Sequence, residues 1–330
     1  MAEFYLSPLR GITDKIFRAA YERRFGRFDY TVAPFVPTIL GSRVKDHHIR
    51  DLLPGDGINN INNDGRLIPQ IIGHDPNGFL LLVRKFADTG FASVNWNLGC
   101  PAPLVAKKKR GCGLLPHKEI IKQFLDEIIP KIPIPLSIKT RLGYESPNDL
   151  EALIPLFNDY PIKELMIHPR TGIQLYGGTV DIDRFENCLS LSKHTIVYNG
   201  DIISVNTFKL LADRFPNVNK WMIGRGIVMN PFLLRELREA VSTESSALIG
   251  SSSTLSTLST LSTKNASQIT YFLNDLLDIC KDHPYPIKVL GRMKEIWRYL
   301  GNGIDGWENL SKKVIQCQSL QEYRTIIDTI

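Results

Sequence analysis

The sequence Lys220-Trp221-Met222-Ile223-Gly224-Arg225-Gly226 decides the fold class of this chain. Its first four residues suit a buried strand, and a glycine-flanked arginine follows at once. Glycine lets backbone N–H groups approach a phosphate, and arginine can bind phosphate through two parallel hydrogen bonds. Phosphate commonly binds after the seventh and eighth strands of an α/β barrel. The fold class therefore depends on the strands that precede this one.

Seven further short apolar segments suit strands that are buried on both faces, and helical patterns lie between them. These segments are Phe4–Ser7, Thr31–Phe35, Leu67–Ile72, Ser93–Asn97, Pro135–Lys139, Glu164–His168 and Thr195–Asn199. One intervening helix, Lys118–Ile129, has a single apolar face and is expected to end at Pro130. Ser204 is expected to cap another. Eight strand–helix units predict an α/β fold of the (β/α)8 TIM barrel type, and the motif after the eighth favours it over an open doubly wound sheet.

The chain is longer than such a barrel needs. It has 330 residues, whereas a barrel uses about 250, so residues 1–240 are expected to form the barrel domain. In 241–266 the composition changes to Ser-Thr-Leu repeats without an apolar helical face, which predicts a linker. Residues 267–330 predict a C-terminal helical-bundle domain, with helical patterns over Ser267–Asp282, Pro286–Leu300 and Leu320–Ile327.

Composition narrows the class of protein. A hydrophobic content of 43% and a charged content of 22% are ordinary for a globular chain. No apolar run approaches the ~20 residues of a membrane-spanning helix, and no signal peptide is evident, so we expect no membrane partner. The five cysteines include no Cys-x-x-Cys pair, which argues against a zinc site and a disulfide framework and fits a reducing cytoplasm best. A net charge of +6 permits a polyanionic partner.

Cys100 is the sharpest candidate for chemistry. It lies in Asn97-Leu98-Gly99-Cys100-Pro101, at the predicted carboxyl end of a strand, and that end faces the active site of a barrel. A thiol there can donate or accept a proton, although an isolated cysteine is more often a buried structural residue. The basic run Lys107-Lys108-Lys109-Arg110 follows. It is either a solvated loop or a contact for the phosphates of a polymeric substrate.

Other strands also end in polar residues. Lys139-Thr140-Arg141 would place a compact positive charge at the mouth, where an anionic cofactor could use it. His168-Pro169-Arg170-Thr171 and Asn199-Gly200-Asp201 end the next two strands. A lone histidine is more often structural, but several polar strand ends that converge on one rim favour a functional site.

Taken in order, these motifs resemble the tRNA-dihydrouridine synthase family over residues from about 7 to 235. The resemblance also includes Ser7-Pro8-Leu9-Arg10-Gly11-Ile12-Thr13-Asp14 and Pro69-Gln70. No single motif is decisive, whereas their order and spacing together are specific. The tail, especially Arg292-Met293-Lys294-Glu295-Ile296-Trp297, is similar to the bacterial subgroup that acts on uridine 16 in the D-loop.

The resemblance implies a barrel that binds FMN, NADPH as reductant, and a helical domain that binds tRNA. Cys100 matches the family's catalytic cysteine, a proton donor to uracil. Matches to cofactor-binding positions are Pro8, Leu9, Arg10, Gln70, Lys139, His168, Asn199, Gly200, Asp201, Gly224 and Arg225. Substrate binding is expected from Asn97, Arg141, Lys107, Lys108, Arg292 and Arg298. We expect a monomer without a metal ion.

Two motifs depart from the family. Lys109 stands where a glycine is usual, and Pro169 stands where glycine or alanine follows the histidine. Three other functions remain open: a dihydropyrimidine or dihydroorotate-type dehydrogenase, a non-catalytic RNA-binding barrel, and a metabolic barrel enzyme with a phosphorylated substrate. The helical tail and the basic loops favour a macromolecular substrate, and the intact Cys100 and Lys139 argue against a non-catalytic protein.

Overall fold

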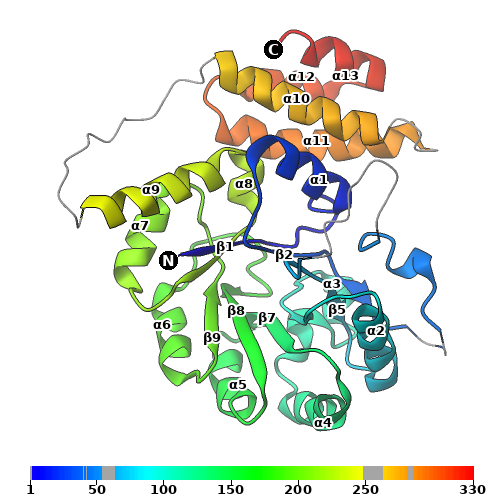
Figure 1. The fold of residues 1–330 in the computed structure, drawn as a ribbon, viewed down its shortest axis with the longest axis vertical. Helices are drawn as coiled ribbons and strands as arrows, with labels where there is room; N and C mark the ends of the chain where they lie inside the picture. The colour runs from blue at the N-terminus through cyan, green and yellow to red at the C-terminus, as the bar shows by residue number, and fades with distance from the viewer. Residues whose placement is uncertain (1, 40, 42, 54–63, 248–262, 281–284) are drawn as a thin grey trace.

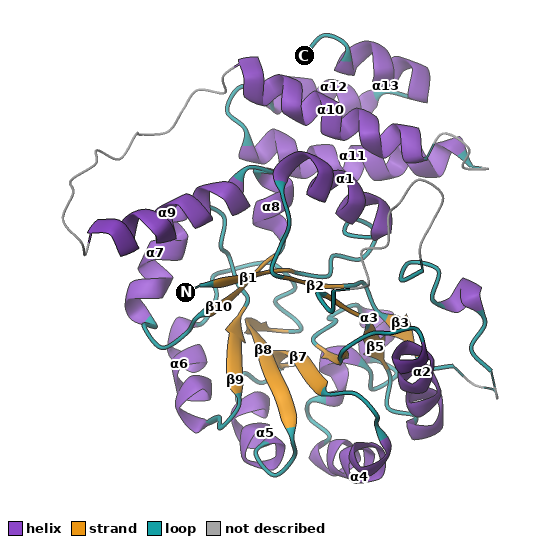
Figure 2. Cartoon of the chain, in the orientation of Figure 1, coloured by secondary structure: helices purple, strands orange, loops and turns teal. Residues whose placement is uncertain are grey.

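The computed structural model describes the chain except residues 1, 40, 42, 54–63, 248–262 and 281–284. Within the described residues, ten short parallel strands form one sheet in the order β3-β5-β6-β7-β8-β9-β10-β1-β2-β4 (Figure 2). The strands are β1 (Glu3–Leu6), β2 (Tyr30–Val32), β3 (Val36–Pro37), β4 (Leu67–Ile68), β5 (Gln70–Ile72), β6 (Val94–Leu98), β7 (Leu136–Gly143), β8 (Ile162–Thr171), β9 (Thr195–Tyr198) and β10 (Lys220–Ile223).

The sheet closes into a barrel through residues 67–72. Only Pro69 separates β4, which pairs with β2, from β5, which pairs with β6. Proline has no N–H to give to a ladder, so it divides the strand, while its carbonyl still accepts from Asn95 N at 2.9 Å. Prolines act in the same way near β2: the segment predicted as Thr31–Phe35 ends at Val32, before Pro34. The predicted barrel is confirmed, with two of its strands interrupted.

Helices cover the outside of the barrel (Figure 1). They are α1 (Lys15–Phe25), α2 (Pro76–Asp88), α3 (Pro103–Ala106), α4 (Lys118–Ile128), α5 (Asp149–Phe157), α6 (Ile182–Leu191), α7 (Val205–Arg214), α8 (Arg225–Met229) and α9 (Leu233–Ala247). The predicted cap of α7 is confirmed, because the Ser204 hydroxyl accepts from Thr207 N at 3.2 Å. The predicted end of α4 is also close, since a 3-10 turn that contains Pro130 follows Ile128.

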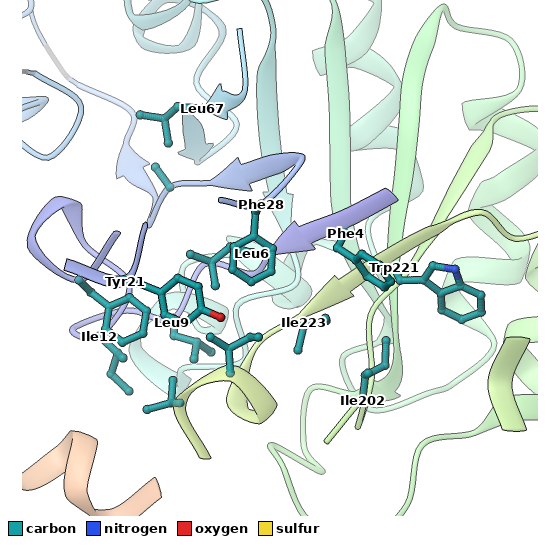
Figure 3. Packing of buried hydrophobic residues seen from close by; sticks show 14 of the residues in the cluster. Phe4, Leu6, Leu9, Ile12, Tyr21, Phe28, Leu67, Ile202, Trp221 and Ile223 are labelled. Atoms are coloured by element: carbon teal, nitrogen blue, oxygen red, sulfur yellow. The ribbon is translucent and has the colours of Figure 1, made fainter. Parts of the chain in front are cut away.

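Alternate side chains of each strand pack on opposite sides of the sheet. Phe4 and Leu6 belong to the main core between strands and helices, with Trp221 and Ile223 of the neighbouring β10 (Figure 3). Tyr5 between them joins a smaller cluster inside the barrel, with Val32, Ile68, Met166, Val197 and Met222. This interior is filled by side chains, so a site can form only at an end of the barrel.

Four helices, α10 (Thr263–Ile279), α11 (Pro286–Gly303), α12 (Glu308–Gln316) and α13 (Leu320–Ile327), form the C-terminal bundle. The bundle lies over α1 and α8 (Figure 1). Phe272 of α10 packs edge-on against Phe17 of α1, with ring centroids 5.5 Å apart. Asp275 accepts two hydrogen bonds from Arg24, at 2.6 and 2.8 Å. None of the described helices is long and apolar enough to cross a membrane.

The boundaries of the predicted linker, residues 241–266, need correction. Helix α9 continues to Ala247 and α10 begins at Thr263, so both extend into it. Ser242 and Thr243 fit into α9 because their hydroxyls donate to the Glu239 carbonyl, at 2.9 and 2.8 Å. The middle of the segment, 248–262, lies outside the described residues.

Candidate active site

The carboxyl ends of the strands surround a hollow of about 900 Å³, its open mouth included. Most of the predicted site residues line it: Pro8, Leu9, Arg10, Gln70, Asn97, Cys100, Lys139, Arg141, His168, Asn199, Gly200, Asp201, Gly224 and Arg225. They come from β5, β6, β7 and β8, from the loops that follow β1, β6, β9 and β10, and from the start of α8. The strand register contributes directly, because it sets Asn97 beside Lys139 and Arg141 beside His168.

A chain of amides crosses one side of the hollow. Asn97 Nδ2 donates to Gln70 Oε1 at 2.7 Å, and Gln70 Nε2 donates to Asn95 Oδ1 at 2.7 Å. Asn95 Nδ2 in turn donates to Ser137 Oγ at 2.9 Å. Since each of these amides is buried and hydrogen-bonded, their orientations are fixed. The amides of Gln70 and Asn97, which line the hollow, therefore have defined positions there.

Asn97 also fixes the loop that carries Cys100, which we call the cysteine loop (residues 99–101). Asn97 Oδ1 accepts from the backbone N–H groups of Gly99 and Cys100, at 3.0 and 2.8 Å. On the other side of the loop, a Cβ at Gly111 would lie 2.5 Å from the Cys100 carbonyl oxygen, so only glycine fits there. The thiol of the buried Cys112 donates to that carbonyl at 3.2 Å. The Cys100 backbone is thus fixed from both sides, which orients its side chain.

The thiol of Cys100 keeps its proton. Burial raises the pKa of Cys100, against the opposing effects of the Arg10, Arg141 and Lys139 charges. The side chain nevertheless lines the hollow and is only partly buried. A protonated, accessible thiol suits a general acid and not a thiolate nucleophile.

Lys139 is one of the basic residues that line the hollow. Its Nζ donates to Asn199 Oδ1 at 2.7 Å, and Asn199 Nδ2 donates to the Met222 carbonyl at 2.8 Å. Burial, together with the Arg141 charge, lowers the pKa of Lys139 to about 7. A negatively charged ligand would favour the charged lysine, so this position is adapted to an anion.

A second network joins β8 to the loop after β9. Arg170 binds Asp201 through two hydrogen bonds, at 3.0 and 2.5 Å, and Arg225 also donates to Asp201, at 2.5 Å. Arg170 Nη1 donates to His168 Nε2 at 3.1 Å, since a guanidinium cannot accept. This bond places the ring proton of neutral His168 on Nδ1. Burial and the surrounding cations, Arg141 first among them, lower the pKa of His168 well below its ordinary value, so the ring stays neutral.

The charge of the hollow predicts its ligand. Among the described residues that line it, Arg10, Lys139, Arg141 and Arg225 are basic and Asp201 is the one carboxylate. Such an excess of positive charge attracts an anion. The donor set fits a flavin mononucleotide: amides and Lys139 suit the polar edge of the ring, and Arg225 beside Gly224 suits the phosphate. No group of three or more metal-ligating side chains occurs in the part of the chain that the structure describes.

Four predicted substrate-binding residues lie outside the hollow. Lys107 and Lys108 are exposed in the loop that follows α3. Arg298 is 56% exposed and pairs with Glu295. Arg292 is only 12% exposed and binds Asp14 Oδ1 at 2.6 Å and the Ile12 carbonyl at 3.1 Å. The contact between Arg292 and the Ile12 carbonyl was not predicted, because no local pattern relates residues that are 280 positions apart.

Tyr176 also lines the hollow, although it is not among the predicted site residues. The Arg225 guanidinium lies over its ring at 4.5 Å from the centroid, and that of Arg141 lies at 5.4 Å. Its position eight residues after the predicted strand-end histidine was the available signal. Tyr176 thus places an aromatic ring at the mouth, in cation–π contact with two arginines.

The fold and the site define a barrel enzyme whose acid and ligand groups lie at the carboxyl ends of the strands. The family model described as Dihydrouridine synthase (Dus) matches residues 5–281. The chain belongs to the dihydrouridine synthase family and is a flavin-dependent oxidoreductase.

Individual relatives agree with this assignment. The chain is 27% identical to tRNA-dihydrouridine synthase B of Pasteurella multocida over 249 residues, which are 74% of this chain and 71% of that protein. It is 27% identical to the protein of the same name from Escherichia coli K12 over 242 residues, 72% of this chain and 71% of that one.

Solved structures support the fold alone. One, titled 2-naphthoyl-CoA reductase with 2-naphthoyl-CoA, has a TM-score of 0.50 at 14% identity and covers 72% of this chain and 50% of its own. Another, titled TcOYE with pHBA, has a TM-score of 0.50 at 11% identity, with coverages of 72% and 89%.

Proposed function

We propose that this protein reduces a uridine of transfer RNA to 5,6-dihydrouridine, with bound FMN as cofactor and NADPH as the source of electrons. The observation that carries the proposal is Cys100. It is a protonated thiol, held by Asn97, in a cationic hollow that fits a flavin. The relatives named tRNA-dihydrouridine synthase B support tRNA as the substrate.

The residues divide into those that would hold the ring and those that would hold the phosphate. Pro8, Leu9 and Arg10 would border the ring, and Gln70, Lys139 and His168 would bind its polar edge. Asn199, Gly200, Asp201, Gly224 and Arg225 would bind the ribityl chain and the phosphate. When bound, the flavin supplies the hydride that adds to C6 of uracil.

The remaining chemistry belongs to side chains of this protein. Cys100 gives its thiol proton to C5 on the opposite face of the uracil ring, and the resulting thiolate regains a proton from water. Asn97 and Arg141 lie close enough to the cysteine loop to bind the uracil carbonyls. Arg141 is itself fixed, because its Nη1 donates to the Thr171 carbonyl at 2.7 Å. Together these groups bind and orient the base.

The substrate has to reach a recessed site. We therefore infer that the uridine is extruded from the folded tRNA, at a cost of a few kcal/mol. Lys107, Lys108 and Arg298, all exposed, would bind phosphates. Arg292 is instead assigned to the contact between bundle and barrel, since Asp14 binds it. The similarity of the tail to one bacterial subgroup supports position 16 in the D-loop, and we propose a cytoplasmic monomer.

The test is the product formed by the wild-type protein. Purified flavoprotein is incubated with NADPH and unmodified tRNA, and dihydrouridine is mapped by position. We expect product at one D-loop uridine, position 16, and no reduction of free uracil or orotate. Product at another single position would correct the site but not the reaction. Turnover of the free pyrimidines without tRNA turnover would overturn the proposal in favour of a small-molecule dehydrogenase.

A further inference from the structure

The loop that follows β8 presents an unusual apolar surface. Within residues 171–178, three large side chains are exposed: Ile173 at 59%, Leu175 at 48% and Tyr176 at 47%. Tyr176 lines the hollow, so the loop stands at its mouth. Single exposed apolar residues are common on proteins, but three in one short loop beside an active site form a patch that suggests contact with a partner.

The loop is held in a strained conformation. Leu175 has a φ of 51°, in the left-handed region that a branched apolar side chain rarely adopts. Leu175 N donates to the Gly172 carbonyl at 3.0 Å, and Gly177 N donates to the Gln174 carbonyl at 2.7 Å. The Gln174 side chain accepts from Thr171 N at 2.7 Å. The fold thus maintains an exposed leucine where glycine would be relaxed, which points to a use for the side chain.

Charge identifies the partner. The loop lies over Arg141 and Arg225, whose guanidinium groups face the Tyr176 ring. Exposed lysines of the loop after α3 add to the positive rim. A partner that combines strong negative charge with flat apolar surfaces is a folded RNA, whose bases stack and whose phosphates are anionic.

We propose that Leu175, supported by Ile173, is an apolar wedge that takes the place of the extruded uridine in the RNA and stacks against the neighbouring bases. The inference rests on the proposed function and deepens it. Extrusion removes the stacking contacts of the target base, and apolar side chains that insert between bases compensate for such losses in other nucleic-acid complexes. A rigid, strained loop suits this function because the wedge is already in position before binding.

The experiment compares Leu175→Ala with Leu191→Ala, an equally apolar exposed leucine on α6 at 43% exposure. Unmodified tRNA with 2-aminopurine at the target position reports extrusion by its fluorescence, which rises when the base unstacks. We expect the wild type and Leu191→Ala to give the rise and Leu175→Ala to lose most of it. On tRNA with uridine at that position, kcat/KM of Leu175→Ala should fall at least tenfold, with an unchanged rate of flavin reduction by NADPH.

The variant Leu175→Gly separates the effect of the side chain on the RNA from its effect on protein stability. It removes the side chain and also relaxes the backbone, so its unfolding midpoint should equal or exceed that of the wild type while kcat/KM falls as in Leu175→Ala. An unchanged fluorescence rise and unchanged kcat/KM in both variants would overturn the wedge. The fluorescence measurement needs no turnover. A wild type that gives the rise but forms no dihydrouridine would therefore contradict the proposed function alone, whereas a wild type that gives no rise would overturn the wedge.

Discussion

At the scale of single residues, the site depends on how buried groups change one another's protonation. Lys139 and Cys100 lie in the same hollow, and each is shifted toward its neutral form, chiefly by burial. For the thiol this preserves the proton that the proposed reaction needs. For Lys139 this means that a negatively charged ligand would stabilise the charged form of the side chain. Cofactor binding and proton donation are therefore linked to one electrostatic environment.

Lys139 predicts a pH dependence of FMN binding. Its pKa is about 7 in the flavin-free protein, whereas that of a free lysine is about 10.4. Above pH 7 the free protein has a neutral lysine, which must take up a proton when the anionic cofactor binds. The affinity for FMN should therefore fall by up to about tenfold per pH unit between pH 7 and 9, and this slope should vanish below pH 7.

The measurement is quenching of FMN fluorescence by apoprotein at pH 7, 8 and 9. Lys139→Met should bind FMN more weakly at pH 7 and should lose the slope. The exposed Lys131→Met is the matched control and should keep it. An identical slope in Lys139→Met would show that another group takes up the proton.

At the scale of elements, the contacts of the bundle with α1 are specific. Asp14 caps α1, because its Oδ1 accepts from Ile16 N and Phe17 N at 3.0 and 3.1 Å, and the same oxygen binds Arg292 of α11. One carboxylate thus caps the N-terminus of a barrel helix and anchors the bundle. The paired Arg24 and Asp275 fix the other contact, between α1 and α10.

Asp14→Ala should therefore destabilise the protein by two mechanisms. It removes a helix cap, which contributes about 1 kcal/mol, and it leaves the mostly buried Arg292 without its carboxylate. We expect the free energy of unfolding to fall by roughly 1–3 kcal/mol in urea titrations. Glu295→Ala, which breaks the exposed pair with Arg298, should change it by less than about 0.5 kcal/mol. Equal effects of the two substitutions would contradict the anchoring function of Asp14.

Sequence could predict the barrel strands and the hollow because both depend on local patterns. Buried strands are short apolar runs, and the polar residues that follow them must meet at one rim. The glycine that is usual in the family at the position of Lys109 also has a local reason: φ here is 50°, a conformation that favours glycine. In the described chain, the other non-glycine residues with positive φ, Leu175 and Asp201, also lie in loops of this rim.

Other features depend on long-range contacts and could not be predicted. The Arg292–Asp14 pair joins elements far apart in the chain, and from the sequence alone Arg292 resembled an RNA contact. Helix α12 was not predicted at all. The interruption of two barrel strands by prolines was also not predicted, because an apolar run indicates a strand whether or not one of its residues lacks the N–H group that the ladder needs.

At the scale of the whole molecule, the barrel contains the candidate active site, and the bundle packs against one side of the barrel. The hollow opens at the carboxyl ends of the strands, and the bundle lies against α1 and α8, the helices that follow β1 and β10 (Figure 1). Positive side chains line the hollow and its rim, whereas residues 266–330 contain equal numbers of acidic and basic residues. The net positive charge therefore belongs to the barrel part of the chain, where the proposed RNA phosphates would bind.

The central claim is that Cys100 protonates the uracil ring, and a single-turnover experiment tests it most directly. Wild type and Cys100→Ala, each loaded with flavin and reduced beforehand, are mixed with unmodified tRNA without oxygen, and dihydrouridine is measured over time. We expect product formation to slow by about 100-fold or more in Cys100→Ala, whereas Cys188→Ala should behave as the wild type. The rate of flavin reduction by NADPH, measured separately, should be unchanged in both variants. Equal rates of product formation in Cys100→Ala and the wild type would contradict the account.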